Sequence, residues 1–194
     1  MFAHAHGRSI EVRSHPSMRR HRLELSSENL RQISYTLRRV PDPHLDPLTR
    51  IEIRQRPRAG GSTNMAGGTT RSTPRADRRY FVVLDIDCFD SPWNNRANGL
   101  NYTLLHEMGH VVDWATGSFT WIRQNDPEGY QAITARSHNG VTTGDQEKFA
   151  DAYADLIYYR GQERAETRSC QAVWDSPCFD GLRARHMMSG AAIA

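Results

Sequence analysis

The sequence of 194 residues has little cysteine, no long apolar run and no apolar leader. A membrane-spanning helix needs about 18 consecutive apolar residues, which the sequence nowhere approaches, so we expect no membrane span. The first residues, Met1 to Arg8, include two histidines and lack the apolar core of a Sec signal peptide. These absences predict a protein that stays in the cytosol, leaves by another route, or is a domain cut from a longer chain.

The overall composition is that of a folded globular protein. Hydrophobic residues make up 38% of the chain and charged residues 24%, which excludes wholesale disorder, collagen and coiled coil. The length suits one domain with a real core, with or without an extension. Residues 1–22 are rich in histidine and arginine and show no clear periodicity. We therefore expect a loosely ordered basic arm over 1–22, followed by a single domain over 23–194.

The three cysteines, Cys88, Cys170 and Cys178, include no Cys-x-x-Cys pair, which excludes a thiolate zinc site of the usual spacing. Cys170 and Cys178 flank a short predicted loop and could close it as a disulfide, which would indicate an oxidising compartment. The alternative is a pair of reduced thiols. Cys88 adjoins the apolar run 81–86, where a buried and inert thiol is the expectation.

Positive charge is concentrated in the first part of the chain. Residues 1–79 contain 16 arginines and 7 acidic residues, whereas residues 80–194 contain 9 basic and 15 acidic residues. Such a basic half can bind a polyanion, but these arginines are scattered and lack the interleaved aromatic residues of a nucleic-acid platform. A solvated basic face is the preferred interpretation, and we do not expect a nucleic-acid partner.

One helix and two strands are predicted in the first half of the chain. Ser26 is a typical helix N-cap, and apolar residues recur at helical spacing from there towards Pro41. Alternating apolar residues predict a half-buried strand over 50–56, and an apolar run predicts a second strand over 80–87. Between them, the Gly-, Ser- and Thr-rich segment 59–73 lacks the Gly-Lys-Ser/Thr ending of a phosphate loop, which favours a flexible hairpin.

Two amphipathic helices are predicted in the second half. The first runs from an Asn101 cap over about 101–115, with Gly117 placed to terminate it. The second covers about 143–160, and Thr143 begins a segment with capping-box spacing. This order of elements predicts an α+β fold in which helices pack on one face of a small mixed sheet.

The first of these helices carries His106-Glu-Met-Gly-His110, an H-E-x-x-H motif. Residues four apart lie on one face of a helix, so both imidazoles can bind one Zn²⁺ while Glu107 reaches a water beside it. By composition alone the motif would occur in roughly 2% of sequences of this length, which disfavours chance. The alternative is a helix that carries two structural histidines.

A catalytic zinc site needs a third protein ligand and an open position. Glu147 on the second helix is the first choice for that ligand, with Asp151 as the second choice. Asp151 would otherwise orient an imidazole from behind. Asp155 continues the same face, so a solvated polar stripe is the alternative for all three. Asp113 shares the histidine face and is either a similar supporting carboxylate or a solvent-exposed one.

These segments resemble the gluzincin metallopeptidases, in particular the anthrax lethal factor catalytic domain and the Pro-Pro endopeptidases. His106-Glu-Met-Gly-His-Val-Val-Asp113 is similar to their zinc helix, and Glu147-Lys-Phe-Ala-Asp-Ala-Tyr153 to the helix with their third ligand. The resemblance covers about residues 100–160. It implies a zincin-like fold, His106, His110 and Glu147 as ligands of Zn²⁺, and Glu107 as the general base.

The resemblance breaks at one position. The family has a tyrosine that stabilises the transition state seven residues before the third ligand, where this sequence has Gly140. His138 is the nearest substitute and Tyr130 a weaker one, while a plain loop histidine is the alternative interpretation of His138.

The expected function is therefore zinc-dependent hydrolysis of peptide bonds in a protein or peptide substrate. Small zincin domains also occur as toxin modules of bacterial secretion systems, which predicts an effector delivered to a target cell by a non-Sec route, with a secretion-machinery or immunity protein as a further partner. The alternatives are a cytoplasmic regulatory zinc protease, a cell-wall amidase, or a non-enzymatic basic module with a structural zinc.

Overall fold

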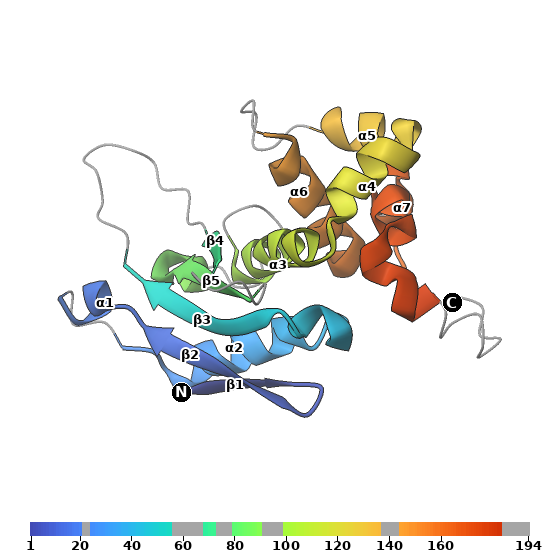
Figure 1. The fold of residues 1–194 in the computed structure, drawn as a ribbon. Helices are drawn as coiled ribbons and strands as arrows, with labels where there is room; N and C mark the ends of the chain where they lie inside the picture. Colours follow the sequence, from blue (N-terminus) through green and yellow to red (C-terminus); the bar gives the residue numbers. More distant parts are fainter. Residues whose placement is uncertain (21–23, 56–67, 73–78, 91–98, 137–143, 184–194) are drawn as a thin grey trace.

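A mixed sheet and a group of helices form the two sides of the molecule (Figure 1). The computed structural model describes residues 1–20, 24–55, 68–72, 79–90, 99–136 and 144–183. The strands are β1 (Phe2–Ala5), β2 (Arg8–Ser14), β3 (Leu48–Arg54), β4 (Gly68–Ser72) and β5 (Tyr80–Asp85). The α-helices are α1 (Pro16–Arg20), α2 (Ser27–Leu37), α3 (Leu100–Thr116), α4 (Ser118–Asn125), α5 (Pro127–Thr134), α6 (Asp145–Tyr158) and α7 (Arg168–Asp175). The predicted α+β class is confirmed.

The five strands are ordered β1-β2-β3-β5-β4. β2, β3 and β5 are parallel, and an antiparallel strand closes each side, β1 on β2 and β4 on β5. Buried residues alternate with less buried ones along β1, β2 and most of β3, whereas β5 is buried on both faces. The buried apolar side chains of the sheet include Ile10, Val12, Ile51, Ile53 and Leu84. Helices α2 and α3 pack on the sheet, α2 against β1 and α3 against β4 and β5, as the helix-on-sheet prediction required.

The expectation of a loosely ordered arm over 1–22 is wrong for the residues that the structure describes. β1 and β2 form a hairpin whose two-residue turn, His6-Gly7, has positive φ at both positions, 50° and 77°. This is the backbone of a type I′ turn, which suits the twist of paired strands and favours glycine. β2 then pairs with β3, so the arm is part of the sheet. The sequence did not reveal these strands, because they are short and their alternating apolar residues lie among histidines and arginines.

The other predicted elements hold to within a few residues. Ser26 caps α2, with its hydroxyl accepting from the Asn29 backbone N–H. Gly117 ends α3 in the left-handed conformation, with φ 71°, but the N-cap is Gly99 and not Asn101. Asn101 is buried inside the helix, where its side-chain oxygen accepts a hydrogen bond from the Thr36 hydroxyl.

Of the predicted hairpin over 59–73, the structure describes residues 68–72, which form the edge strand β4. α6 begins after Gly144, its N-cap, and the predicted cap Thr143 lies outside the described residues. Cys170 and Cys178 are buried thiols rather than a disulfide, and burial raises the pKa of the Cys178 thiol to about 11. Cys88 is buried as expected, which raises the pKa of its thiol to about 12.

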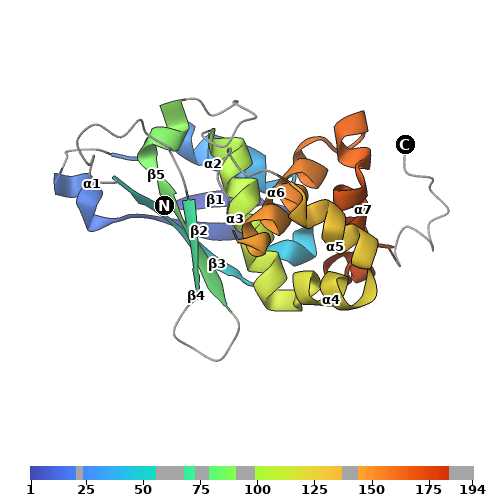
Figure 2. The same ribbon diagram turned by 90° about the horizontal axis from the view of Figure 1, so that it is seen from above.

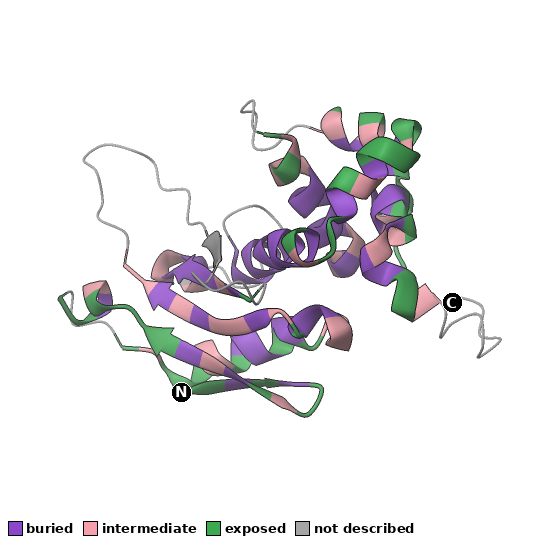
Figure 3. Cartoon of the chain, in the orientation of Figure 1, coloured by how far each residue is buried: buried purple, intermediate pink, exposed green. Residues whose placement is uncertain are grey.

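α3 is the central element of the molecule (Figure 2), lying between the sheet and the helices α4 to α7. It is buried along nearly its whole length, from Leu100 to Asp113 (Figure 3). Within the described ranges, no helix combines the length and the apolar character that crossing a bilayer requires. A helix buried on all sides can hold polar residues only where partners are provided, and the H-E-x-x-H motif lies in this helix.

Candidate metal centre

The candidate site lies where α3 and α6 touch, and a glycine makes that contact close. A Cβ on Gly109 would lie 2.8 Å from the Cα of Ala150 on α6, nearer than non-bonded carbons approach. Glycine at this middle position of the motif therefore lets the two backbones meet. The helices then lie near enough for the side chains of α6 to reach the histidines of α3.

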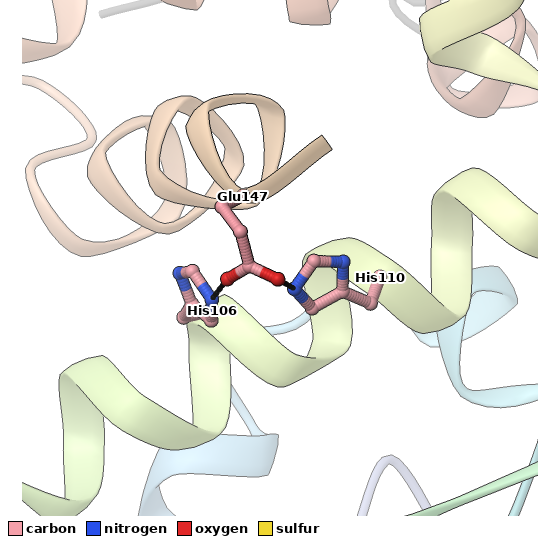
Figure 4. Close-up of side chains that lie close together, drawn as sticks. All are labelled: His106, His110 and Glu147. Atoms are coloured by element: carbon pink, nitrogen blue, oxygen red, sulfur yellow. Dashed lines mark hydrogen bonds and ion pairs between the residues drawn. The ribbon is translucent and has the colours of Figure 1, made fainter. Parts of the chain in front are cut away.

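Three side chains converge at this crossing (Figure 4). Nε2 of His106 lies 3.1 Å from Oε2 of Glu147, and Nε2 of His110 lies 3.4 Å from Oε1 of the same carboxylate. Each of the three residues, together called the metal group, offers one ligand atom, and these atoms lie within 4.8 Å of one another. The predicted ligand set His106, His110 and Glu147 is thus brought together by two helices that residues 117–144 separate in the sequence.

Asp151 supports His106 from behind. Its Oδ1 lies 2.8 Å from Nδ1 of His106, which donates to the carboxylate and leaves Nε2 directed at Glu147. Burial lowers the pKa of His106, but the hydrogen bonds to Asp151 and Glu147 outweigh burial and raise it to about 10. Hydrogen bonds from His106 and His110 hold the pKa of Glu147 well below its usual value. Of its two predicted roles, Asp151 takes the supporting one.

The site is closed on the histidine side and open on the glutamate side. The side chains of His106 and His110 are 10% and 8% exposed, whereas that of Glu147 is 42% exposed. Nδ1 of His110 is buried and has no hydrogen-bond partner among the described residues. The two imidazoles are therefore shielded, and the group reaches solvent on the side of the Glu147 carboxylate.

Two further acidic residues lie on α3, Glu107 between the two histidines and Asp113 after them. Glu107 is 4% exposed, and its negative charge contributes to the raised pKa of His106. Asp113 is also buried, which raises the pKa of its carboxyl group. It accepts a hydrogen bond of 2.7 Å from the Phe119 backbone N–H and so holds the start of α4. Of the two alternatives left open for Asp113, the solvent-exposed carboxylate is therefore wrong.

Asp151 and Asp155 on α6 are buried against neighbouring groups, so the polar stripe is not solvated at these two positions, whereas Glu147 is partly exposed. Asp155, one turn beyond Asp151, accepts hydrogen bonds from the Tyr102 hydroxyl and the Arg136 guanidinium. Tyr102 lies on α3, so this second contact fixes α6 against α3 beyond the metal group. Arg136 was not singled out from the sequence, because nothing in its neighbourhood reveals a partner 19 residues away.

The two proposed substitutes for the missing tyrosine have different outcomes. His138 lies outside the described residues. Tyr130 lies on α5, and its hydroxyl donates to Oδ2 of Asp145 at 3.1 Å, at the first residue of α6. Tyr130 is therefore engaged beside the start of the ligand-bearing helix.

An aromatic pair beside the metal group was not recognised in the sequence. Trp114 lies one helical turn after His110, with its ring centroid 5.9 Å from the imidazole and 5.6 Å from the ring of Tyr80. The sequence signal for Trp114 was its position four residues after the second histidine, on the same face of the helix.

No family model, curated protein or solved structure matches this chain, so the geometry carries the functional argument.

Proposed function

We propose that this protein is a zinc-dependent metallopeptidase of the gluzincin type. The observation that carries the proposal is the convergence of His106, His110 and Glu147, with Asp151 holding the first imidazole. Two neutral nitrogens and one carboxylate are the ligand set of several catalytic zinc sites. The donors fit such an ion because both Nε2 atoms already face an anionic group and the carboxylate is accessible.

When bound, Zn²⁺ would act as a Lewis acid that polarises a substrate carbonyl and makes a water more acidic. His106, His110 and Glu147 would hold it, and Asp151 would keep Nδ1 of His106 protonated so that Nε2 faces the ion. The proton on Nε2 of His106 must leave before the ion binds, so loading releases a proton.

Glu107 is the proposed general base. Adjacent to the ligand His106 and buried beside the site, it would accept the proton of the attacking water and deliver it to the leaving amine. His138 remains the proposed partner for the developing oxyanion, on the sequence argument alone. The analogy with zincin toxin modules of bacterial secretion systems is the basis for a further proposal. The protein would be an effector that acts on a protein or peptide substrate, leaves by a non-Sec route and pairs with a secretion or immunity protein.

The test measures casein hydrolysis by the zinc-loaded wild type, Glu107→Gln and Glu163→Gln. Glu163 is an exposed glutamate away from the site and serves as the matched control. We expect Glu107→Gln to keep its zinc and to lose activity by about 10³-fold, because a positioned base contributes on the order of 10²–10⁴-fold. Turnover that survives in Glu107→Gln would refute its role as the base.

A second arm separates the alternatives. Release of amino groups from peptidoglycan without cleavage of casein would indicate a cell-wall amidase. Zinc without either activity, together with salt-sensitive binding to a polyanion that ignores Glu107→Gln, would indicate a basic binding module with a structural zinc.

A further inference from the structure

Trp114 is an exposed aromatic ring at the edge of the metal group. Among the described residues, the large hydrophobic side chains that are exposed are Met1, Phe2, Tyr35 and Trp114. Of these, only Trp114 has a ring contact with a candidate metal ligand, His110. Its side of α3 is the histidine side, because positions 106, 110 and 114 recur at one helical turn. An apolar surface left open at this place points to a ligand.

Tyr80 on β5 holds the indole of Trp114 in place. Tyr80, the first residue of β5, is 8% exposed and packs against the indole at 5.6 Å between centroids. The Tyr80 hydroxyl donates to the backbone carbonyl of Trp114 at 3.0 Å. The strand therefore fixes the position of the last turn of α3. A ring whose backing is fixed in this way presents a preformed surface, and binding to it loses little freedom.

The distance from the metal group suits a neighbouring residue of a bound peptide. The indole centroid lies 5.9 Å from that of His110, and an extended chain advances about 3.3–3.6 Å per residue. A substrate with its scissile carbonyl near the ligand atoms would place the side chain one or two residues away over the indole.

The chemistry of the surface selects an apolar group. Trp114 offers a ring face, and the buried Tyr80 behind it uses its hydroxyl for the hydrogen bond to the Trp114 carbonyl. An indole can also attract a cation. A divalent ion held by the adjacent His110 would repel a cationic side chain, because the ion makes the local electric field positive.

We propose that Trp114, backed by Tyr80, is a substrate subsite that selects an apolar side chain one or two residues from the cleaved bond. This inference rests on the proposed metallopeptidase function. It assigns the substrate class as a peptide with a large aliphatic or aromatic residue at that position.

The test measures binding rather than turnover. Peptide hydroxamates, whose hydroxamate group chelates the metal, would carry Leu, Phe, Gly, Asp or Lys one or two residues from it, and their affinities for zinc-loaded wild type would be measured by calorimetry. We expect the Leu and Phe compounds to bind about tenfold or more tightly than the Gly compound, since small differences of apolar contact discriminate about 10–200-fold.

Three variants and a control locate that preference. Trp114→Ala and Trp114→Gln should reduce the preference to less than about threefold, and Trp114→Phe should retain most of it, as expected for loss or retention of apolar contact area. Tyr35→Ala removes an exposed aromatic residue from α2, a helix that carries none of the metal group. It should leave the apolar preference unchanged. Zinc content and circular dichroism equal to wild type show that each variant is folded.

The outcomes separate this inference from the proposed function. Casein hydrolysis with an unchanged apolar preference in both Trp114→Ala and Trp114→Gln would overturn the subsite alone, as would a preference for the Lys compound. Zinc-loaded protein that shows the preference but cleaves no peptide would refute the peptidase and the assignment to a cleaved substrate, and would leave Trp114 as an apolar binding surface beside the metal. Protein that binds no zinc would overturn both.

Discussion

Two buried histidines contact α6, and they show how partners, rather than burial, decide what a histidine does. His106 lies between two carboxylates, Asp151 and Glu147, which raise its pKa to about 10. His44 receives a hydrogen bond from the Tyr153 hydroxyl at Nδ1 and donates from Nε2 to the Cys178 carbonyl, both at 2.8 Å. Burial lowers the pKa of His44 to about 4, so it is neutral.

The two surroundings suit different tasks. The partners of His44 are uncharged, satisfy both nitrogens and join the segment before β3 to α6 and to the chain after α7. His44 is therefore a structural residue. The anionic partners of His106 stabilise a positive charge on the metal-free protein, and a cation can replace the proton on Nε2 while Asp151 stays in place.

The largest expected effect concerns His44 and pH. Its pKa of about 4 in the folded state lies below the 6.5 of an unfolded histidine. Its stabilising contribution is thus complete above pH 6.5 and is lost as the pH falls towards 4, because the unfolded chain takes up the proton first. The loss is about 3 kcal/mol, from roughly 1.4 kcal/mol per pKa unit.

Urea unfolding of the metal-free protein at several pH values measures this effect. His44→Asn serves as the reference, because it lacks the titrating imidazole. Between pH 6.5 and 4 its free energy of unfolding should therefore fall by about 3 kcal/mol less than that of the wild type. Equal pH dependence in the wild type and His44→Asn would contradict the assignment of His44 as a neutral structural residue.

Gly109→Ala tests the close approach of α3 and α6. The new Cβ would meet the Ala150 backbone at 2.8 Å, so the helices must separate. We expect a loss of about 2 kcal/mol of stability, typical of overpacking, together with weaker zinc binding. Gly181→Ala has open space around its Cβ and is the matched control. Unchanged zinc affinity in Gly109→Ala would show that the metal group does not depend on this contact.

Asp151→Asn tests the difference between the two histidines most narrowly. The amide keeps the shape of the side chain but removes the charge that holds Nδ1 of His106. We expect zinc affinity to fall by about tenfold or more, as is usual for the groups that support metal ligands. Competition with a chelator of known affinity gives the constant. An unchanged affinity would mean that Asp151 has no part in orienting the imidazole.

The metal group was predictable because its information is local to two helices. The spacing of His106 and His110 and the face shared by Glu147 and Asp151 depend only on helical periodicity. What the sequence concealed depends on long-range pairing. The hairpin of β1 and β2 needed β3 as a partner, and His44, which no local pattern distinguishes, finds its partners 109 and 134 residues away.

Zinc per chain, measured by elemental analysis after loading and desalting, tests the central claim most directly. Wild type, Glu147→Ala and the exposed control Glu163→Ala would be compared side by side. The account predicts close to one zinc per chain in the wild type and the control, and a sharp reduction in Glu147→Ala, because two imidazoles alone form an incomplete site. A wild type that binds no zinc, or a Glu147→Ala variant that binds it fully, would contradict the account.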